Sequence, residues 1–218
     1  MAYDLEEQEQ IATLKSWWNQ HGNLVTIVAT AALLTIAGIQ GWRYYRHHQS
    51  VAAVTLYEQM ERAERGADYK KVRDIAAQIV DKYGSTPYAI MAALASAKAA
   101  FTSGDLAAAK AQLNWVMEHG REAEIKDLAR LRLAGVLLDE KKYDEALNLL
   151  EGKPVESMTG LYADLKGDIL AAQGKIAEAR NAYQLALDKS ESGSTYRAVI
   201  QLKLDALGEK PQAVSGKQ

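Results

Sequence analysis

The residues of this 218-residue chain that are best suited to chemistry are four histidines and two pairs of adjacent acids. His47 and His48 could bind a metal ion, but neighbouring helical side chains point about 100° apart. No carboxylate lies within one turn of them, so they are better interpreted as polar residues at an interface. Asp139-Glu140 and Asp144-Glu145 flank a turn with two lysines, which indicates a solvated charge cluster. We therefore predict no catalytic and no metal-binding residue.

Other reaction centres are also missing from the sequence. No serine lies in a nucleophile-elbow pattern, and no glycine-rich loop precedes a helix as a phosphate cradle. The chain has no cysteine, which excludes disulfides and thiolate metal sites. Its 26 basic and 28 acidic residues nearly balance, so the basic face that binds nucleic acid is absent. We expect a protein that is not an enzyme, needs no cofactor and binds no nucleic acid.

Composition favours an all-α fold. Alanine is abundant, proline occurs three times and phenylalanine once, and no stretch alternates as a strand does.

Residues 22–42 carry no charge and are predicted to form a transmembrane helix. About 20 helical residues cross a hydrocarbon core of roughly 30 Å. Aromatic rings, which prefer the membrane interface, border the run on both sides: they are Trp17, Trp18, Trp42, Tyr44 and Tyr45. A buried core helix is one alternative, and a cleaved signal peptide is another. An acidic start and an end in Trp and Arg favour an uncleaved anchor.

The flanks of this span are predicted to differ in character. Residues 1–21 form an amphipathic segment, with Ile11, Leu14 and Trp18 on one face. Residues 43–66 form a membrane-proximal helix. Arg43 and Arg46 follow the span and only Lys15 precedes it, so the positive-inside rule taken literally places the C-terminal part in the cytoplasm.

Residues 67–207 contain an internal repeat. Four turn-and-helix stretches align, and their first apolar residues, Tyr69, Leu106, Tyr143 and Ile176, are 37, 37 and 33 residues apart. Small residues recur on both helices of each hairpin. On the second helix they are Val72, Ala109, Ala146 and Ala179, and before the turn they are Ala97, Ala134 and Gly167. Larger residues follow four positions later, at Leu113, Leu150 and Tyr183. Antiparallel helices approach closely only where small residues meet, so this pattern is that of a tetratricopeptide repeat.

The pattern predicts a solenoid of about four helical hairpins, and a generic helical bundle is the alternative. The expected helices are Ser50–Arg65, Lys70–Tyr83, Thr86–Ser103, Asp105–His119, Glu122–Glu140, Tyr143–Glu151, Ser157–Gln173, Ile176–Ser190 and Ser194–Leu207. The last of these should cap the solenoid with an outer face made polar by Arg197, Gln201 and Lys203. Residues 208–218 are expected to be a disordered tail.

Stacked hairpins offer a concave surface to other proteins. The repeat register predicts the following partner-binding residues on that surface: Met91, Leu94, Lys98, Phe101, Leu128, Leu131, Leu138, Leu161, Asp164 and Asp168. The seven residues from Met91 to Leu138 would form an apolar groove, and the last three, from Leu161 to Asp168, would form an acidic end. The alternative is that the leucines belong to the core.

The chain resembles the YfgM family over nearly its whole length. The resemblance rests on the span exit GWRYYRHHQ, on DKYGSTPYA between the first two repeats, and above all on ADLKGDILAAQGKIAEARNAY at residues 163–183. It implies an ancillary SecYEG translocon subunit of the bacterial inner membrane, with a cytoplasmic N-terminus and periplasmic repeats. It also implies association with the membrane-anchored periplasmic chaperone PpiD, and with unfolded client segments during handover of translocated proteins.

Two functions follow from these observations. The first is a membrane-anchored interaction module beside the translocon. The second is a cytoplasm-facing scaffold that recruits soluble partners through the repeat groove. The first agrees with the resemblance, because a bias of one charge is small and long domains translocate largely regardless of it.

Overall fold

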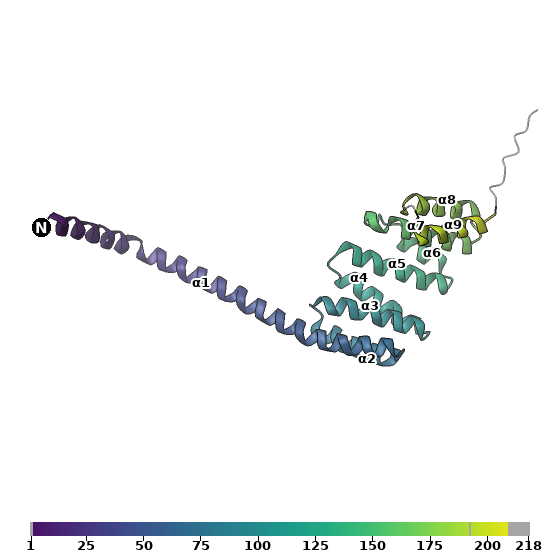
Figure 1. The fold of residues 1–218 in the computed structure, drawn as a ribbon, viewed down its shortest axis with the longest axis horizontal. Helices are drawn as coiled ribbons and strands as arrows, with labels where there is room; N and C mark the ends of the chain where they lie inside the picture. Colours follow the sequence, from purple (N-terminus) through teal and green to yellow (C-terminus); the bar gives the residue numbers. More distant parts are fainter. Residues whose placement is uncertain (1, 192, 209–218) are drawn as a thin grey trace, which may run out of the picture. The chain divides into compact units, whose positions relative to one another are not determined.

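Helices make up all the regular structure in the part of the chain that this computed structural model describes, residues 2–191 and 193–208 (Figure 1). They are α1 (Ala2–Arg65), α2 (Tyr69–Tyr83), α3 (Pro87–Thr102), α4 (Leu106–His119), α5 (Ala123–Asp139), α6 (Tyr143–Leu149), the 3₁₀ turn η1 (Glu156–Met158), α7 (Thr159–Ala172), α8 (Ile176–Asp188) and α9 (Thr195–Ala206). No strand occurs among the described residues, and the predicted all-α fold is confirmed. Apart from Gly208, the predicted tail lies outside the described residues.

The chain divides into two units, residues 1–51 and 52–218, and α1 contributes to both. In the first unit the apolar side chains of the predicted span are exposed; Leu24, Leu33 and Leu34, for example, are each at least 65% exposed. Only 6% of the most apolar window of α1 is buried within the protein. A core helix would be mostly buried, so that alternative is wrong. Among the described residues, α1 is the one helix long and apolar enough to cross a membrane.

The predicted N-terminal segment, span and membrane-proximal helix run together as one helix. Residues 50–65 continue the span, as the sequence suggested, but the N-terminal segment is not a separate helix. The chain has no proline before Pro87, and the helix continues through Gly22, Gly38 and Gly41. The domain boundaries predicted at residues 21, 42 and 66 stay predictions, because composition rather than helix breaks defined the first two.

The second unit consists of hairpins stacked in chain order (Figure 1). The last turns of α1 pair with α2, α3 pairs with α4, α5 with α6 and α7 with α8, and α9 closes the series. The small residues predicted at the helix contacts are all buried: Val72, Ala109, Ala146 and Ala179 are 0% exposed, Ala97 and Ala134 are at most 3% exposed, and Gly167 is buried too. The hairpin solenoid predicted from the repeat is confirmed.

The larger residues that the repeat register matches to these small positions are also buried. Leu113 and Leu150 are 2% and 6% exposed. In the last hairpin glycine replaces alanine, and Tyr183 replaces the leucine. A Cβ atom added at Gly167 would lie 2.5 Å from the Tyr183 ring. Glycine is therefore required there for the ring to lie against α7.

All four hairpins turn in the same way. Two residues after the end of the first helix, the chain has a residue with a left-handed backbone: these residues are Ala67, Gly104, Lys141 and Gly174, with φ between 54° and 79°. In each turn the next backbone N–H donates to the carbonyl five residues earlier, as in Asp105 to Ala100 at 2.9 Å and Lys175 to Leu170 at 2.9 Å. This Schellman arrangement satisfies the last carbonyls of the helix. Two of the four positions hold residues with a side chain, which the sequence pattern did not anticipate.

The closing helix α9 differs from the predicted polar cap. Lys203 and Arg197 point inward: Lys203 pairs with acids of α7, and Arg197 donates to the carbonyl oxygens of Leu187 and Ser190. Leu202 is 69% exposed and Val199 44% exposed. Of the three predicted outer polar residues, only Gln201 is exposed, because Lys203 pairs with the acids of α7 and Arg197 bonds to backbone carbonyl oxygens at the end of α8.

Candidate protein-interaction site

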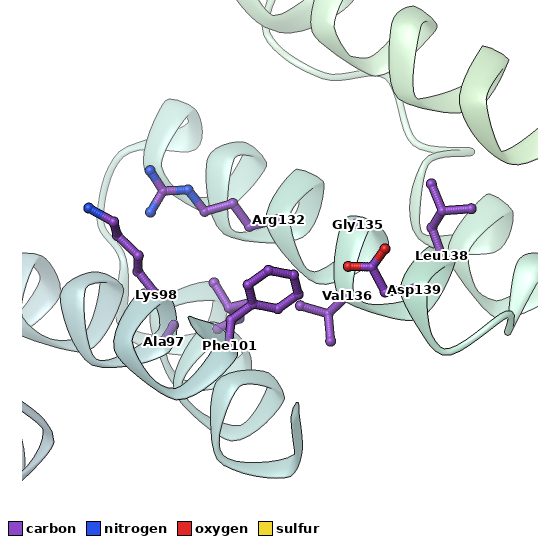
Figure 2. Close-up of a pocket in the computed structure, with 9 residues that line it drawn as sticks. Ala97, Lys98, Phe101, Arg132, Gly135, Val136, Leu138 and Asp139 are labelled. Atoms are coloured by element: carbon purple, nitrogen blue, oxygen red, sulfur yellow. The ribbon is translucent and has the colours of Figure 1, made fainter. Parts of the chain in front are cut away.

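The second and third hairpins enclose a concave pocket of about 470 Å³, here called the central pocket (Figure 2). Its lining residues are Ala97, Lys98, Phe101, Leu113, Arg132, Gly135, Val136, Leu138 and Asp139. They come from α3, α4 and α5. The pocket thus brings together three of the predicted partner-binding residues: Lys98, Phe101 and Leu138.

One lining residue of the pocket, Gly135, departs from the pattern of the repeat register. Gly135 occupies the position that Lys98 holds in the preceding hairpin and Asp168 in the following one. A Cβ atom built on Gly135 would meet nothing within 4 Å, so the space beside it is open. Buried Leu113 and Val136 provide an apolar floor, and Phe101, 42% exposed, stands in the opening. The list of predicted partner-binding residues omitted Gly135 because it has no side chain, although it is equivalent in the register to Lys98 and Asp168, which the list includes.

Charged groups line the rim of the central pocket. Lys98 Nζ lies 2.9 Å from Glu64 Oε1, and this hydrogen bond raises the pKa of Lys98. Arg132 and Asp139 are exposed, and neither makes a hydrogen bond or ion pair with another described residue. In Figure 2 Lys98 and Arg132 extend at one end and Asp139 lies at the other, with the Phe101 ring between them. The sequence prediction did not include Arg132 or Asp139, because neither is an inward position of the register.

The other predicted apolar residues are mostly shared with the core. Leu94 and Leu131 are half-buried and pack against the core of the second and third hairpins, and Leu128 and Leu161 are also half-buried. Met91 is 45% exposed and lines a smaller pocket of about 190 Å³ with residues of the α2–α3 turn and the start of α5. As partner-binding residues, these five stay predictions.

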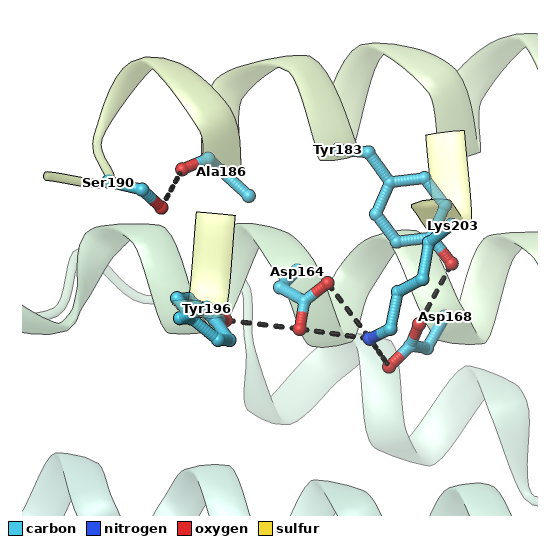
Figure 3. Close-up of polar contacts among 7 residues, drawn as sticks. All are labelled: Asp164, Asp168, Tyr183, Ala186, Ser190, Tyr196 and Lys203. Atoms are coloured by element: carbon cyan, nitrogen blue, oxygen red, sulfur yellow. Dashed lines mark hydrogen bonds and ion pairs between the residues drawn. The ribbon is translucent and has the colours of Figure 1, made fainter. Parts of the chain in front are cut away.

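The predicted acidic end of the groove is occupied by the chain itself (Figure 3). Lys203 Nζ lies 3.0 Å from both carboxylate oxygens of Asp164 and 2.8 Å from Asp168 Oδ2. The Tyr196 hydroxyl donates to Asp164 at 3.0 Å, and the Tyr183 hydroxyl to Asp168 at 2.8 Å. Asp164 is only 8% exposed. These two acids therefore hold α9 against α7, and we no longer expect them to face a partner.

Burial and charge act together on the pKa values of this cluster. Burial, together with Asp168 for Tyr183 and with Asp164 for Tyr196, raises the pKa of each tyrosine well above its ordinary range. Burial alone would lower the pKa of Lys203, but its bonds to Asp168 and Asp164 outweigh that effect and raise it. The cluster is thus a charged, fully bonded contact that favours the protonated tyrosines and lysine.

Three of the residues first considered for chemistry, Glu140, Asp144 and His48, contact other side chains of the protein. Glu140 accepts two hydrogen bonds from Lys110 at 2.7 and 2.6 Å, and chiefly for this reason its pKa is lowered. Asp144 accepts a hydrogen bond from Gln173 at 3.0 Å. The His48 ring lies edge-on to Tyr44, with centroids 5.8 Å apart. In the described part of the chain, no three His, Cys, Asp or Glu side chains form a group that could hold a metal ion.

Comparison with known proteins agrees with this geometry. Residues 15–209 match the family described as the tetratricopeptide repeat-like domain. A protein of Neisseria gonorrhoeae named ancillary SecYEG translocon subunit is 35% identical over 216 residues, which cover 95% of this chain and 100% of that protein. Its namesake in Haemophilus influenzae is 31% identical over 211 residues with the same coverage, and that of Escherichia coli K12 is 26% identical over 202 residues, 92% of this chain and 96% of the relative.

Proposed function

The chain belongs to the YfgM family of ancillary SecYEG translocon subunits, and from this premise we propose that it is a membrane-anchored protein-interaction module that works beside the translocon. The proposal requires no catalytic step. The single observation that carries it is the central pocket, an open apolar surface on a solenoid of hairpins, whose rim charges Arg132 and Asp139 have no partner within the described part of the chain. Solenoids of this kind serve mainly to present such surfaces to other chains.

We further propose a topology and partners. The exposed apolar stretch of α1 would cross the bacterial inner membrane, with the N-terminus in the cytoplasm and the hairpins in the periplasm. In that position the hairpins could bind the chaperone PpiD and help to hand over emerging client segments. The aromatic residues at both ends of the span, Trp17, Trp18, Trp42, Tyr44 and Tyr45, suit the two interfaces, being 48–71% exposed.

A photo-crosslinking amino acid tests the interaction surface. Placed at Phe101 in the full chain in intact cells, it should form adducts with a translocon subunit, PpiD or a nascent client. The matched control is the same group at Ala111, an exposed residue of the second helix α4 that lies outside the pocket. Equal adducts from both positions, or adducts from Ala111 alone, would refute the central pocket as the interaction surface.

One observation favours the second candidate, a cytoplasm-facing scaffold. Arg43 and Arg46 follow the span, whereas only Lys15 lies close before it. Because the chain has no cysteine, Lys153→Cys would supply a unique thiol at an exposed position between α6 and η1. Labelling by a thiol reagent that cannot cross the inner membrane supports the periplasmic topology. Labelling only after lysis, with a periplasmic cysteine as positive control, would establish the cytoplasmic scaffold instead.

A further inference from the structure

We infer that the central pocket selects a bipolar peptide segment, in which an apolar side chain lies between an acidic residue and a basic one. This inference rests on the proposed function and adds the chemistry of the partner. It follows from three features of the pocket: its apolar floor, two rim charges that have no partner among residues 2–191 and 193–208, and the spacing of those charges along α5.

The apolar part of the pocket requires an anchor. Leu113 and Val136 form the floor, and the exposed ring of Phe101 forms a wall. Beside them Gly135 leaves open space, within a cavity of about 470 Å³. An aromatic or branched aliphatic side chain would fill this volume and cover the Phe101 ring.

The two ends of the pocket differ in charge. At one end Lys98 is already paired with Glu64 at 2.9 Å, so the net positive charge there comes from Arg132. A free guanidinium offers a fork of donors that matches a carboxylate. At the other end Asp139 is an exposed acid without a partner among the described residues. A segment carrying one sign of charge throughout would be attracted at one end and repelled at the other.

The spacing of these charges fits an extended chain. Arg132 and Asp139 are seven residues apart on α5, which places them on the same face, about 10 Å apart along the helix axis. In an extended peptide, alternate residues point the same way, and four residues span about 13 Å. Acid, anchor and base at alternate positions would therefore reach Arg132, the floor and Asp139 together, because long flexible side chains absorb the difference.

Three peptides test the selectivity on the full chain in detergent micelles. The first is Ser-Glu-Ser-Phe-Ser-Lys-Ser, blocked at both ends; the second replaces its Glu by Gln, and the third replaces its Lys by Gln. Binding is measured by fluorescence anisotropy of the dye-labelled peptides. Each exposed ion pair should contribute about two- to fivefold in affinity at low salt, and added salt should reduce the difference.

Variants of the protein assign each charge to its partner. Arg132→Gln should remove the preference for the Glu peptide over its Gln counterpart, and Asp139→Asn should remove the preference for Lys. Lys166→Gln is the matched control, because Lys166 is an exposed cation of α7 outside the pocket, and it should change neither. Gly135→Leu should abolish binding of all three peptides, since its side chain fills the open space without a clash at Cβ.

The outcomes separate this inference from the proposed function. Equal binding of the three peptides, or no binding of any, overturns the inference, as does a preference for Glu that survives Arg132→Gln. If crosslinking from Phe101 in cells still captures a partner, the proposed function stands without it. If that crosslinking fails as well, both are refuted.

Discussion

Size matching between Gly167 and Tyr183 makes the sharpest test of the hairpin packing. In the repeat register, the three later hairpins match Ala97 with Leu113, Ala134 with Leu150, and Gly167 with the larger Tyr183. Adding one methyl group at Gly167 puts its carbon 2.5 Å from two atoms of the tyrosine ring. The ring is 3% exposed and its hydroxyl is bound to Asp168 at 2.8 Å, so it has little freedom to move away.

The magnitude follows from two opposing contributions. Overpacking of a rigid site costs about 3 kcal/mol, the upper part of its usual range. Replacing helical glycine by alanine gains about 1 kcal/mol. Gly167→Ala should therefore lower the free energy of unfolding by about 2 kcal/mol, which corresponds to a fall in Tm of about 4–8 °C for a chain of this size. Gly135→Ala, with open space at its Cβ, should instead raise stability by up to about 1 kcal/mol.

Thermal unfolding of the full chain in detergent, followed by circular dichroism, measures both variants. Hydrogen exchange of α7 and α8 locates the loss. In a Tyr183→Leu background the last hairpin resembles the other two, so Gly167→Ala should become stabilising by about 1 kcal/mol, a coupling of about 3 kcal/mol between the two sites. If Gly167→Ala were neutral or stabilising with Tyr183 present, the close approach of α7 and α8 through this glycine would be refuted.

Two further predictions concern the turns and the closing helix. Lys141→Gly should stabilise the chain by about 1 kcal/mol, because a φ of 60° strains a residue that has a side chain. Gly174→Ala, at a φ of 75°, should destabilise the chain by a similar amount for the same reason. A shift of Tm in the same direction for both variants would contradict this. The raised pKa values of Tyr183, Tyr196 and Lys203 stabilise the fold fully below about pH 10, the ordinary tyrosine value, and that contribution is lost as pH rises through the raised values. Tyr196→Phe should therefore flatten the alkaline fall of Tm with pH, and an unchanged slope would exclude the cluster as its cause.

The repeat was predictable from the sequence because close packing leaves a direct mark on it. Two helices cannot approach unless small residues meet, so Ala109, Ala146 and Ala179 recur at positions that the structure buries completely. The turns recur for a similar reason, since each hairpin needs one left-handed residue to reverse the chain. Each of these constraints fixes a residue type at a repeating position, so it can be recognised in one sequence.

The partners of Asp164 and Asp168 were not predictable in this way. Their register assigned them to the concave face, but Lys203 lies 39 and 35 residues further on, in the helix that follows the four hairpins. Only the docking of α9 shows that the two acids face a cation of the same chain. The prediction of a polar outer face on α9 was wrong for the same reason. The sequence shows which residues a helix contains, but not which of them face bonding partners on the neighbouring helices.

Cations recur one residue after the small position of the second helices, and they connect successive hairpins. Arg73 reaches Asp105 at 2.7 Å, Lys110 reaches Glu140, and Arg180 donates to backbone carbonyls at the end of α9. In each case the contact runs to the turn or terminus of the next element. Leu147 breaks the series in the third hairpin, whose second helix is also the shortest in this unit.

The third hairpin is instead fastened through its first helix, α5, by contacts of Asp127. Asp127, 6% exposed, accepts a hydrogen bond from Val155 N at 2.8 Å and pairs with Arg130, and the Tyr162 hydroxyl donates to its backbone carbonyl at 3.0 Å. These contacts tie α5 to the segment that follows α6. The first helix α5 is thus fixed at its N-terminal end by a buried acid. Its C-terminal half is left to line the central pocket with Arg132, Gly135 and Asp139. The charges of Arg132 and Asp139 take no part in contacts between the described hairpins.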